Sequence, residues 1–291
     1  MKKILVTGAA GLLGQYLVYN LFKDYAVLGI DAAPNPFKLK HNFNYVKHNL
    51  INKDKTLTLI NEFQPNAVFN CAAFTDVDAC EQYRALASQL NTEIVEILNE
   101  SNVKKIIHYS TDYIFGNQNS GPYSELDAPG PLNFYGQTKL ESEEIIKKSN
   151  KPYCIIRTNG LFGKGAKTRS NFVSWVKQTL DAKKEILVPY DQFYNPIHAG
   201  NLAEASIELM KTSYNGIINV AGRSYISKYE AAIVIADHFN LIDELVIPVT
   251  TEQLNQKAKR PLNGGLKIDL AHSFLQTKLE NFPTSLKTRQ I

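Results

Sequence analysis

Tyr135 and Lys139 are the residues whose types and spacing best suit a chemical reaction. If both lie on one helix, a spacing of four places them one turn apart on the same face. The ammonium would then lower the pKa of the phenol, which predicts a proton donor working near neutral pH. Because the chain has 15 Tyr and many Lys, about one such pair is expected by chance. Tyr19 and Lys23 have the same spacing, so context must choose between the pairs.

A hydroxyl group that could act with Tyr135 comes from Thr111. The apolar segment 106–109 precedes it and predicts a buried strand. Ligands of open α/β sheets bind at the carboxyl ends of the strands, so Thr111 is expected at that edge. Asn133 has a residue type that caps helices, and a helix over 133–148 would carry Tyr135 in its first turn. Tyr19 has no such hydroxyl partner, and the context therefore favours Tyr135.

A glycine turn near the N-terminus is the element expected to hold a cofactor. Gly8, Gly11 and Gly14 lie between an apolar strand at 4–6 and a helix with apolar residues at helical spacing. This is the context that a dinucleotide site requires, although G-x-x-G-x-x-G alone is a weak signal. Glycines let the backbone approach a pyrophosphate, whose charge meets the amides of the helix N-terminus. The alternative is a plain glycine-rich turn between a strand and a helix.

The choice between the two nicotinamide cofactors depends on Asp31, which ends a second apolar run at 26–30. A carboxylate there accepts hydrogen bonds from ribose hydroxyls and repels a 2′-phosphate, so NAD(H) is preferred over NADP(H). Lys38 and Lys40 would reverse this preference if they folded back toward the ribose, which keeps NADP(H) as an alternative. An Asp that merely caps a loop is the structural explanation of the same residue.

Composition narrows the class of protein. A net charge of +4 over 291 residues is mild and unclustered, so we expect no nucleic-acid or membrane partner. The cysteines Cys71, Cys80 and Cys154 lack Cys-x-x-Cys spacing and suit a reducing compartment. The scattered histidines predict no metal site, and the short apolar N-terminus does not resemble a signal peptide. We therefore expect a cytoplasmic protein. A phosphate loop near 160–168 is rejected because Lys167 comes one residue too late.

The remaining pattern alternates strands and helices. A loop rich in proline and glycine at 116–131 could lie over a ligand. Further strands are expected at 43–50, 67–70, 153–157, 186–188 and 217–220, and helices at 55–63, 77–101, 171–182, 199–210 and 228–239.

These features together resemble the extended short-chain dehydrogenase/reductase superfamily, in which a TGxxGxxG turn, a Ser or Thr and a YxxxK pair form the shared apparatus. Within it, the chain is most similar to the dTDP-4-dehydrorhamnose reductases. The similarity is carried, in order along most of the chain, by NCAAFTDVD at 70–78, STDYIF at 110–115, PLNFYGQTKLESE at 131–143, IRT at 156–158, and Arg260-Pro261 before Leu266.

The resemblance implies a Rossmann-type doubly wound parallel sheet with a smaller C-terminal substrate-binding lobe. The dinucleotide-binding domain would cover 1–165, with the chain returning to it near 195–220. The lobe would come mainly from 166–291, interleaved with that domain. A homodimer is compatible with this family.

The implied reaction is hydride transfer to the C4 ketone of a nucleotide-linked 4-keto-6-deoxysugar. Tyr135 would donate the proton, Thr111 would hydrogen-bond the carbonyl oxygen, and Lys139 would bind the nicotinamide ribose. The implied cofactor-binding residues are Gly8, Gly11, Leu12, Leu13, Gly14, Asp31, Asn49, Leu50, Cys71, Ala72, Ala73, Tyr135 and Lys139. The implied substrate-binding residues are Thr75, Asp78, Asp112, Tyr113, Asn159 and Arg260, the last either on the diphosphate or in a surface salt bridge.

The chain departs from the family on the substrate side. The family usually has Ser-Trp after the Arg-Thr strand exit, where the aromatic ring stacks in the sugar-nucleotide pocket. Asn159-Gly160 stand here instead, so that stacking surface is expected to be missing. The segment FYNPI at 193–197 likewise replaces the usual sequence after Asp-Gln. Because of both changes, the sequence does not determine which sugar nucleotide is the substrate.

Two alternatives remain from the sequence. One is an NAD-dependent sugar-nucleotide epimerase, since Tyr113, where dehydratases carry Glu, argues against dehydration but not epimerisation. The other is a cofactor-binding regulatory subunit similar to the β subunit of methionine adenosyltransferase. The intact set of Thr111, Tyr135 and Lys139 argues against a pure binding role.

Overall fold

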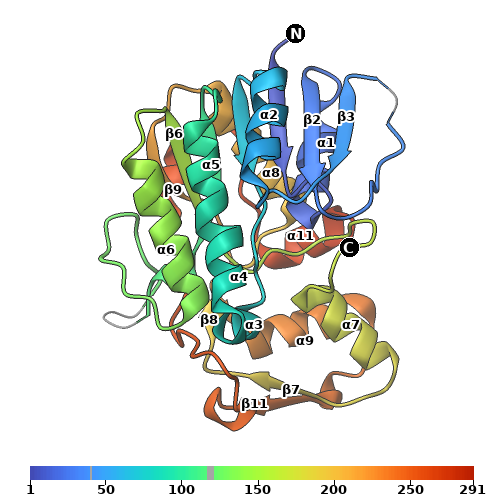
Figure 1. Ribbon diagram of the computed structural model, residues 1–291. Helices are drawn as coiled ribbons and strands as arrows, with labels where there is room; N and C mark the ends of the chain where they lie inside the picture. The colour runs from blue at the N-terminus through green and yellow to red at the C-terminus, as the bar shows by residue number, and fades with distance from the viewer. Residues whose placement is uncertain (40, 117–120) are drawn as a thin grey trace.

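A parallel β-sheet forms the centre of the protein, as a computed structural model that describes residues 1–39, 41–116 and 121–291 shows (Figure 1). It has seven strands in the order β3-β2-β1-β4-β5-β6-β9, and each neighbouring pair is parallel. The strand order reverses between β1 and β4, where doubly wound folds bind ligands. The strands are β1 (Lys3–Thr7), β2 (Ala26–Asp31), β3 (Phe43–Lys47), β4 (Ala67–Asn70), β5 (Ile106–Thr111), β6 (Tyr153–Thr158) and β9 (Gly216–Asn219).

Helices cover both faces of this sheet, because successive side chains of each strand point to opposite sides. Ile4 and Val6 of β1 pack in the core with α1 (Leu12–Leu21) and α8 (Ala199–Lys211). Leu5, between them, packs in the opposite core with residues of three other helices. These are α2 (Lys53–Phe63), α5 (Ile94–Glu100) and α6 (Phe134–Lys147), which lie in front of the sheet in Figure 1. The Rossmann-type prediction is confirmed.

The single helix predicted over 77–101 is wrong. The chain there forms α3 (Val77–Gln82), α4 (Arg84–Ser88), a π-helical turn η1 (Gln89–Glu93) and then α5. The π-helical turn carries Asn91, which is fully buried and must satisfy its amide. Its Oδ1 accepts from the Phe74 amide at 2.8 Å, and its Nδ2 donates to Thr138 Oγ1 at 2.9 Å. These bonds explain why the regular helix is interrupted at this polar residue.

A second core lies beyond the carboxyl ends of the strands, at the bottom of Figure 1. It is built by α7 (Phe172–Asp181), α9 (Lys228–Phe239) and the parallel pair of β7 (Ile186–Pro189) and β11 (Val246–Val249). The prediction missed β11 and the antiparallel pair of β8 (Phe193–Tyr194) and β10 (Ile226–Ser227). It also missed the C-terminal helices α10 (Asp269–Phe274) and α11 (Phe282–Thr288), and the short turns η2 (Asp112–Ile114), η3 (Asp243–Leu245) and η4 (Glu252–Leu254).

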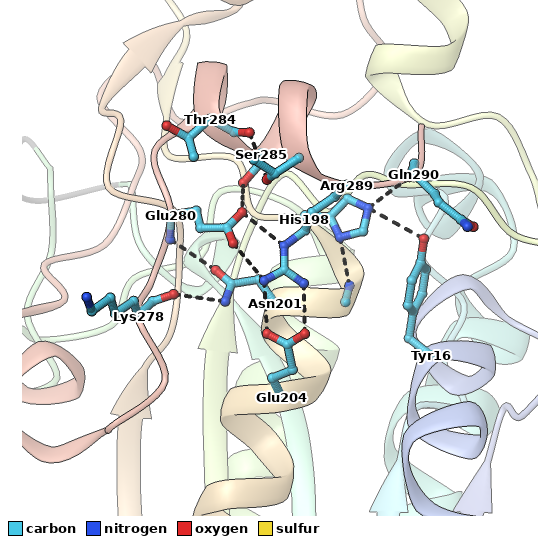
Figure 2. Close-up of polar contacts among 12 residues, drawn as sticks. Tyr16, His198, Asn201, Glu204, Lys278, Glu280, Thr284, Ser285, Arg289 and Gln290 are labelled. Carbon is cyan, nitrogen blue, oxygen red and sulfur yellow. Dashed lines mark hydrogen bonds and ion pairs between the residues drawn. The ribbon is translucent and has the colours of Figure 1, made fainter.

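The C-terminal segment is fastened to α8 by charged side chains (Figure 2). Arg289 pairs with both oxygens of Glu204 at 2.9 Å, and its Nη2 lies 2.7 Å from Glu280 Oε1. His198, at the N-cap of α8, lies with its Nε2 3.0 Å from the backbone oxygen of Gln290. These contacts hold the end of the chain against α8, which packs with α1 on one face of the sheet.

Across the described parts of the chain, we find no helix with the length and apolar character needed to span a bilayer.

Candidate active site

Thr111 and Tyr135 come together at the carboxyl edge of the sheet. Thr111 ends β5, and Tyr135 lies in the first turn of α6, whose N-cap Asn133 accepts from the Gly136 amide at 2.8 Å. The helix approaches closely because residue 136 is glycine: a Cβ there would lie 2.1 Å from the Tyr113 backbone oxygen. The rings of Tyr113 and Tyr135 meet edge to face, with centroids 6.0 Å apart.

The expected lowering of the Tyr135 pKa by Lys139 is wrong for this structure. Burial raises the pKa of Tyr135, and the nearby hydroxyl of Thr111 opposes that rise only in part. Burial dominates because the phenolate would lose its hydration. The phenol therefore stays protonated, which is the form that a proton donor requires.

Lys139 instead contacts a buried histidine. Its Nζ lies 3.1 Å from His108 Nε2, and burial lowers the pKa of Lys139 to about 8. His108 also lies 3.1 Å from Asn70 Nδ2 through Nδ1 and 3.0 Å from Ser142 Oγ through Nε2. Asn70 in turn accepts from Thr7 Oγ1 at 2.7 Å. A histidine inside the apolar strand 106–109 is the sequence signal for this network, but the contacts of that histidine could not be predicted from the sequence.

A cavity of about 200 Å³ lies where the glycine turn meets the ends of β2 and β4. The turn is tight, since a Cβ on Gly8 would lie 2.6 Å from the Ala72 backbone nitrogen. The N-cap of α1, Gly11, has no side chain that accepts a hydrogen bond from the first amides of the helix. These amides are therefore available to an anionic ligand. The cavity is lined by Gly8, Gly11, Asp31, Ala32, His48, Asn49, Leu50, Cys71, Ala72, Ala73, Leu90 and Ile94. This surface fits a dinucleotide.

Most of the predicted cofactor residues line this cavity. Leu12, Leu13 and Gly14 do not, since they form the first turn of α1, where Leu13 packs in the core. Tyr135 and Lys139 of α6 do not line it either. Ala32, His48, Leu90 and Ile94 line it but were not predicted. The carboxylate of Asp31 accepts from the amides of Ala10 and Ala33, each at 2.9 Å. Lys38 is exposed, and Lys40 lies outside the described residues.

A second cavity, of about 70 Å³, opens beside Thr111 and Tyr135. It brings together Asp112, Tyr113 and Asn159 from the predicted substrate residues. Asp112 is buried, and burial raises its pKa although its Oδ2 accepts from Asn159 Nδ2 at 2.8 Å and from the Gly265 amide at 3.1 Å. The lining consists of Asp112, Tyr113, Asn159, Gly160, Gln192, Phe193, Tyr194, Lys228, Pro261 and Gly264.

Three further substrate candidates lie outside this lining. Asp78 and Arg260 form an ion pair with each other, with distances of 2.6 Å from Nη1 to Oδ1 and 2.8 Å from Nη2 to Oδ2. A further hydrogen bond joins Arg260 to Tyr113. The guanidinium is thus engaged by partners within the protein. Thr75 lies in the segment between β4 and α3 and is not part of the cavity wall.

The space beside Gly160, where the sequence predicted that a stacking surface is missing, is occupied by an aromatic ring from another part of the chain. A Cβ on Gly160 would lie 2.5 Å from Cδ2 and Cε2 of Tyr194, so the ring of Tyr194 fills that space. Glycine at 160 is required by this contact and by a backbone φ of +54°. Because Gly160 and Tyr194 are far apart in the sequence, their contact could not be predicted from it.

Comparisons with known proteins agree with the fold. The chain matches the RmlD substrate binding domain family over residues 1–289. It is 33% identical to methionine adenosyltransferase 2 subunit beta of Danio rerio, covering 91% of this chain and 83% of that protein. It is 31% identical to dTDP-4-dehydrorhamnose reductase of Aggregatibacter actinomycetemcomitans, covering 92% and 91%. The structure of dTDP-4-dehydrorhamnose reductase from Bacillus anthracis in complex with NADP superimposes with a TM-score of 0.86 at 26% identity, covering 99% and 98%.

Proposed function

The chain belongs to the RmlD substrate-binding-domain family, and we propose that it reduces the 4-keto group of a nucleotide-diphospho-4-keto-6-deoxysugar with NAD(P)H. The observation that carries this proposal is the placement of Thr111, at the end of β5, near the phenol of Tyr135, in the first turn of α6. Thr111 contacts Asp112 and Tyr135 contacts Tyr113, two residues that line the small cavity, and the same sheet edge holds the cavity at the glycine turn. A nicotinamide cofactor, when bound, supplies the hydride.

Tyr135 donates the proton to the carbonyl oxygen, and Thr111 hydrogen-bonds the same oxygen. The raised pKa of Tyr135 supports the donor role, because the phenol holds its proton until an alkoxide develops beside it. Lys139 binds the nicotinamide ribose in this proposal. Its ammonium is buried and close enough to the Cys71 thiol of the cofactor cavity to lower the pKa that burial raises there.

The sugar would occupy the small cavity. Asp112, Tyr113 and Asn159 present hydrogen-bonding groups to it, and Thr75 would act at its outer side. Asp78 and Arg260 reach the substrate only if their ion pair opens. The second core, built by α7, α9, β7 and β11, would serve as the substrate-binding lobe.

A second candidate function is favoured by one observation, the 33% identity with a methionine adenosyltransferase β subunit. In that case, the chain would bind a cofactor and a partner enzyme without turnover. The two functions make opposite statements about the Thr111–Tyr135 pair. A reductase needs it, and a binding subunit does not.

The test is NADH and NADPH oxidation by the purified protein with dTDP-4-dehydrorhamnose. The proposal expects substrate-dependent oxidation of one or both cofactors, and the ratio of the two rates measures the preference that Asp31 is expected to set. Absence of oxidation, together with stoichiometric capture of a methionine adenosyltransferase catalytic subunit, would establish the second candidate. Tightly bound NAD that is recycled during sugar inversion would indicate an epimerase.

A further inference from the structure

Lys228 is a cation of the small cavity that the resemblance did not assign. It occupies the first position of α9, fixed by a capping box in which Ser227 Oγ accepts from the Glu230 amide and Glu230 Oε2 accepts from the Ser227 amide. Its own amide donates to the Gln192 backbone oxygen at 2.9 Å. The backbone that carries this lysine is therefore held from both sides.

The ammonium of Lys228 rests on an aromatic surface. Its Nζ lies 3.4 Å from the ring centroid of Tyr194 and 4.7 Å from that of Phe172. Cation–π attraction holds a cation over such faces and leaves its N–H groups free to donate elsewhere. Tyr194 is the ring that fills the space beside Gly160. The aromatic ring beside Gly160 thus comes with a charge seated on it.

Within the described part of the chain, Lys228 makes no ion pair with a carboxylate, whereas Arg260 is engaged by Asp78. Asp112 is close enough to favour the charged lysine, but its oxygens accept from Thr111, Asn159 and Gly265. Burial lowers the pKa of Lys228 to about 8, which still leaves most of it protonated near neutral pH. A buried ammonium near a carboxylate with which it forms no ion pair is incompletely compensated, and an anion in the cavity would reduce that cost.

We propose that Lys228, seated on Tyr194, binds an anionic oxygen of the nucleotide sugar beside the reacting carbonyl. This inference rests on the proposed reductase function, since it places the sugar in the cavity next to Thr111 and Tyr135. The oxygen comes from the diphosphate, because a 6-deoxysugar carries a methyl group and no carboxylate at C6. A lysine donates to a phosphate oxygen as a point charge.

The test measures dissociation constants by calorimetry for dTDP-glucose, UDP-glucose and UDP-glucuronate, with NADP⁺ saturating. Lys228→Met should weaken binding at least about tenfold, as expected for one charge-assisted hydrogen bond. Equal weakening for all three ligands supports a phosphate oxygen, and weakening confined to UDP-glucuronate would overturn that assignment. Lys228→Arg, which keeps the charge, should retain more binding than Lys228→Met.

Lys184→Met is the matched control, since Lys184 is an exposed lysine between α7 and β7 of the second core and lines neither cavity. Unchanged dissociation constants in Lys228→Met would overturn the inference while leaving the reductase proposal standing. A wild-type protein that binds none of the three ligands would overturn both. NADP⁺ affinity and the thermal unfolding temperature are measured for the same variants. A loss of sugar-nucleotide binding with both values unchanged indicates ligand recognition, whereas a lowered unfolding temperature indicates that Lys228 mainly packs over Tyr194. Lys228→Gln carries the same expectation if the Met variant does not fold.

Discussion

Replacing Arg157 by methionine should destabilise the protein strongly, because it leaves a carboxylate buried without its partner. Arg157 and Glu143 form a two-point ion pair, with Nε 3.0 Å from Oε1 and Nη2 2.7 Å from Oε2. Their side chains are 3% and 0% exposed. A third bond, from Arg157 Nη1 to the Glu125 backbone oxygen at 3.2 Å, would be lost as well.

The expected loss is about 3–5 kcal/mol of unfolding free energy, the range for breaking a buried pair by removing one partner. Such a loss is a large fraction of the stability of an ordinary domain. The double variant Arg157→Met/Glu143→Met should be more stable than Arg157→Met alone, because no charge is then left buried. Urea denaturation at fixed pH measures both differences.

Lys147→Met provides the control on the same helix, since the Lys147–Glu144 pair is 2.8 Å long but 32% and 48% exposed. Its loss should be less than about 1 kcal/mol, because water screens an exposed pair. If Arg157→Met/Glu143→Met loses as much unfolding free energy as Arg157→Met and Glu143→Met lose together, the unpaired buried carboxylate is not the cause and the reasoning fails.

Two further predictions concern the site and its surroundings. Gly136→Ala should reduce turnover far more than it reduces the affinity for NADP⁺, because the new Cβ collides with the Tyr113 backbone and shifts Tyr135. Steady-state kinetics and NADP⁺ titration measure the two effects, and unchanged turnover would contradict the prediction. Burial lowers the pKa values of His48, His108 and His198 in the folded chain, so below about pH 6.5 the unfolded chain binds more protons and the unfolding free energy should fall as pH decreases. His198→Asn keeps a cap acceptor for the Gly200 amide and should flatten that decline in urea titrations at several pH values; an unaltered slope would contradict the assignment to His198.

The sheet and its cofactor edge were predictable because each rests on local signals. Apolar runs, the glycine turn and the Asn133 cap follow from neighbouring residues. The π-helical turn was not predictable, since Asn91 is held by Phe74 and Thr138, which contact it only in the folded chain.

The site was predictable in its residue types and less so in its electrostatics. Thr111 and Tyr135 could be paired by topology, but the pKa of Tyr135 depends on how deeply the ring is buried. The contact between Gly160 and Tyr194 joins the segment after β6 to β8, and the cation over that ring comes from α9. Contacts of this kind depend on tertiary packing, which periodicity does not encode.

The central claim is that Tyr135 is the proton donor of a nicotinamide-dependent ketone reduction. The most direct measurement compares kcat for NAD(P)H oxidation with dTDP-4-dehydrorhamnose in the wild type, Tyr135→Phe and Tyr19→Phe. Tyr19 has the same spacing to a lysine, but it is 48% exposed and lies on α1. We predict a loss of about a hundredfold or more for Tyr135→Phe and wild-type turnover for Tyr19→Phe. Turnover of Tyr135→Phe within about tenfold of the wild type would contradict the claim.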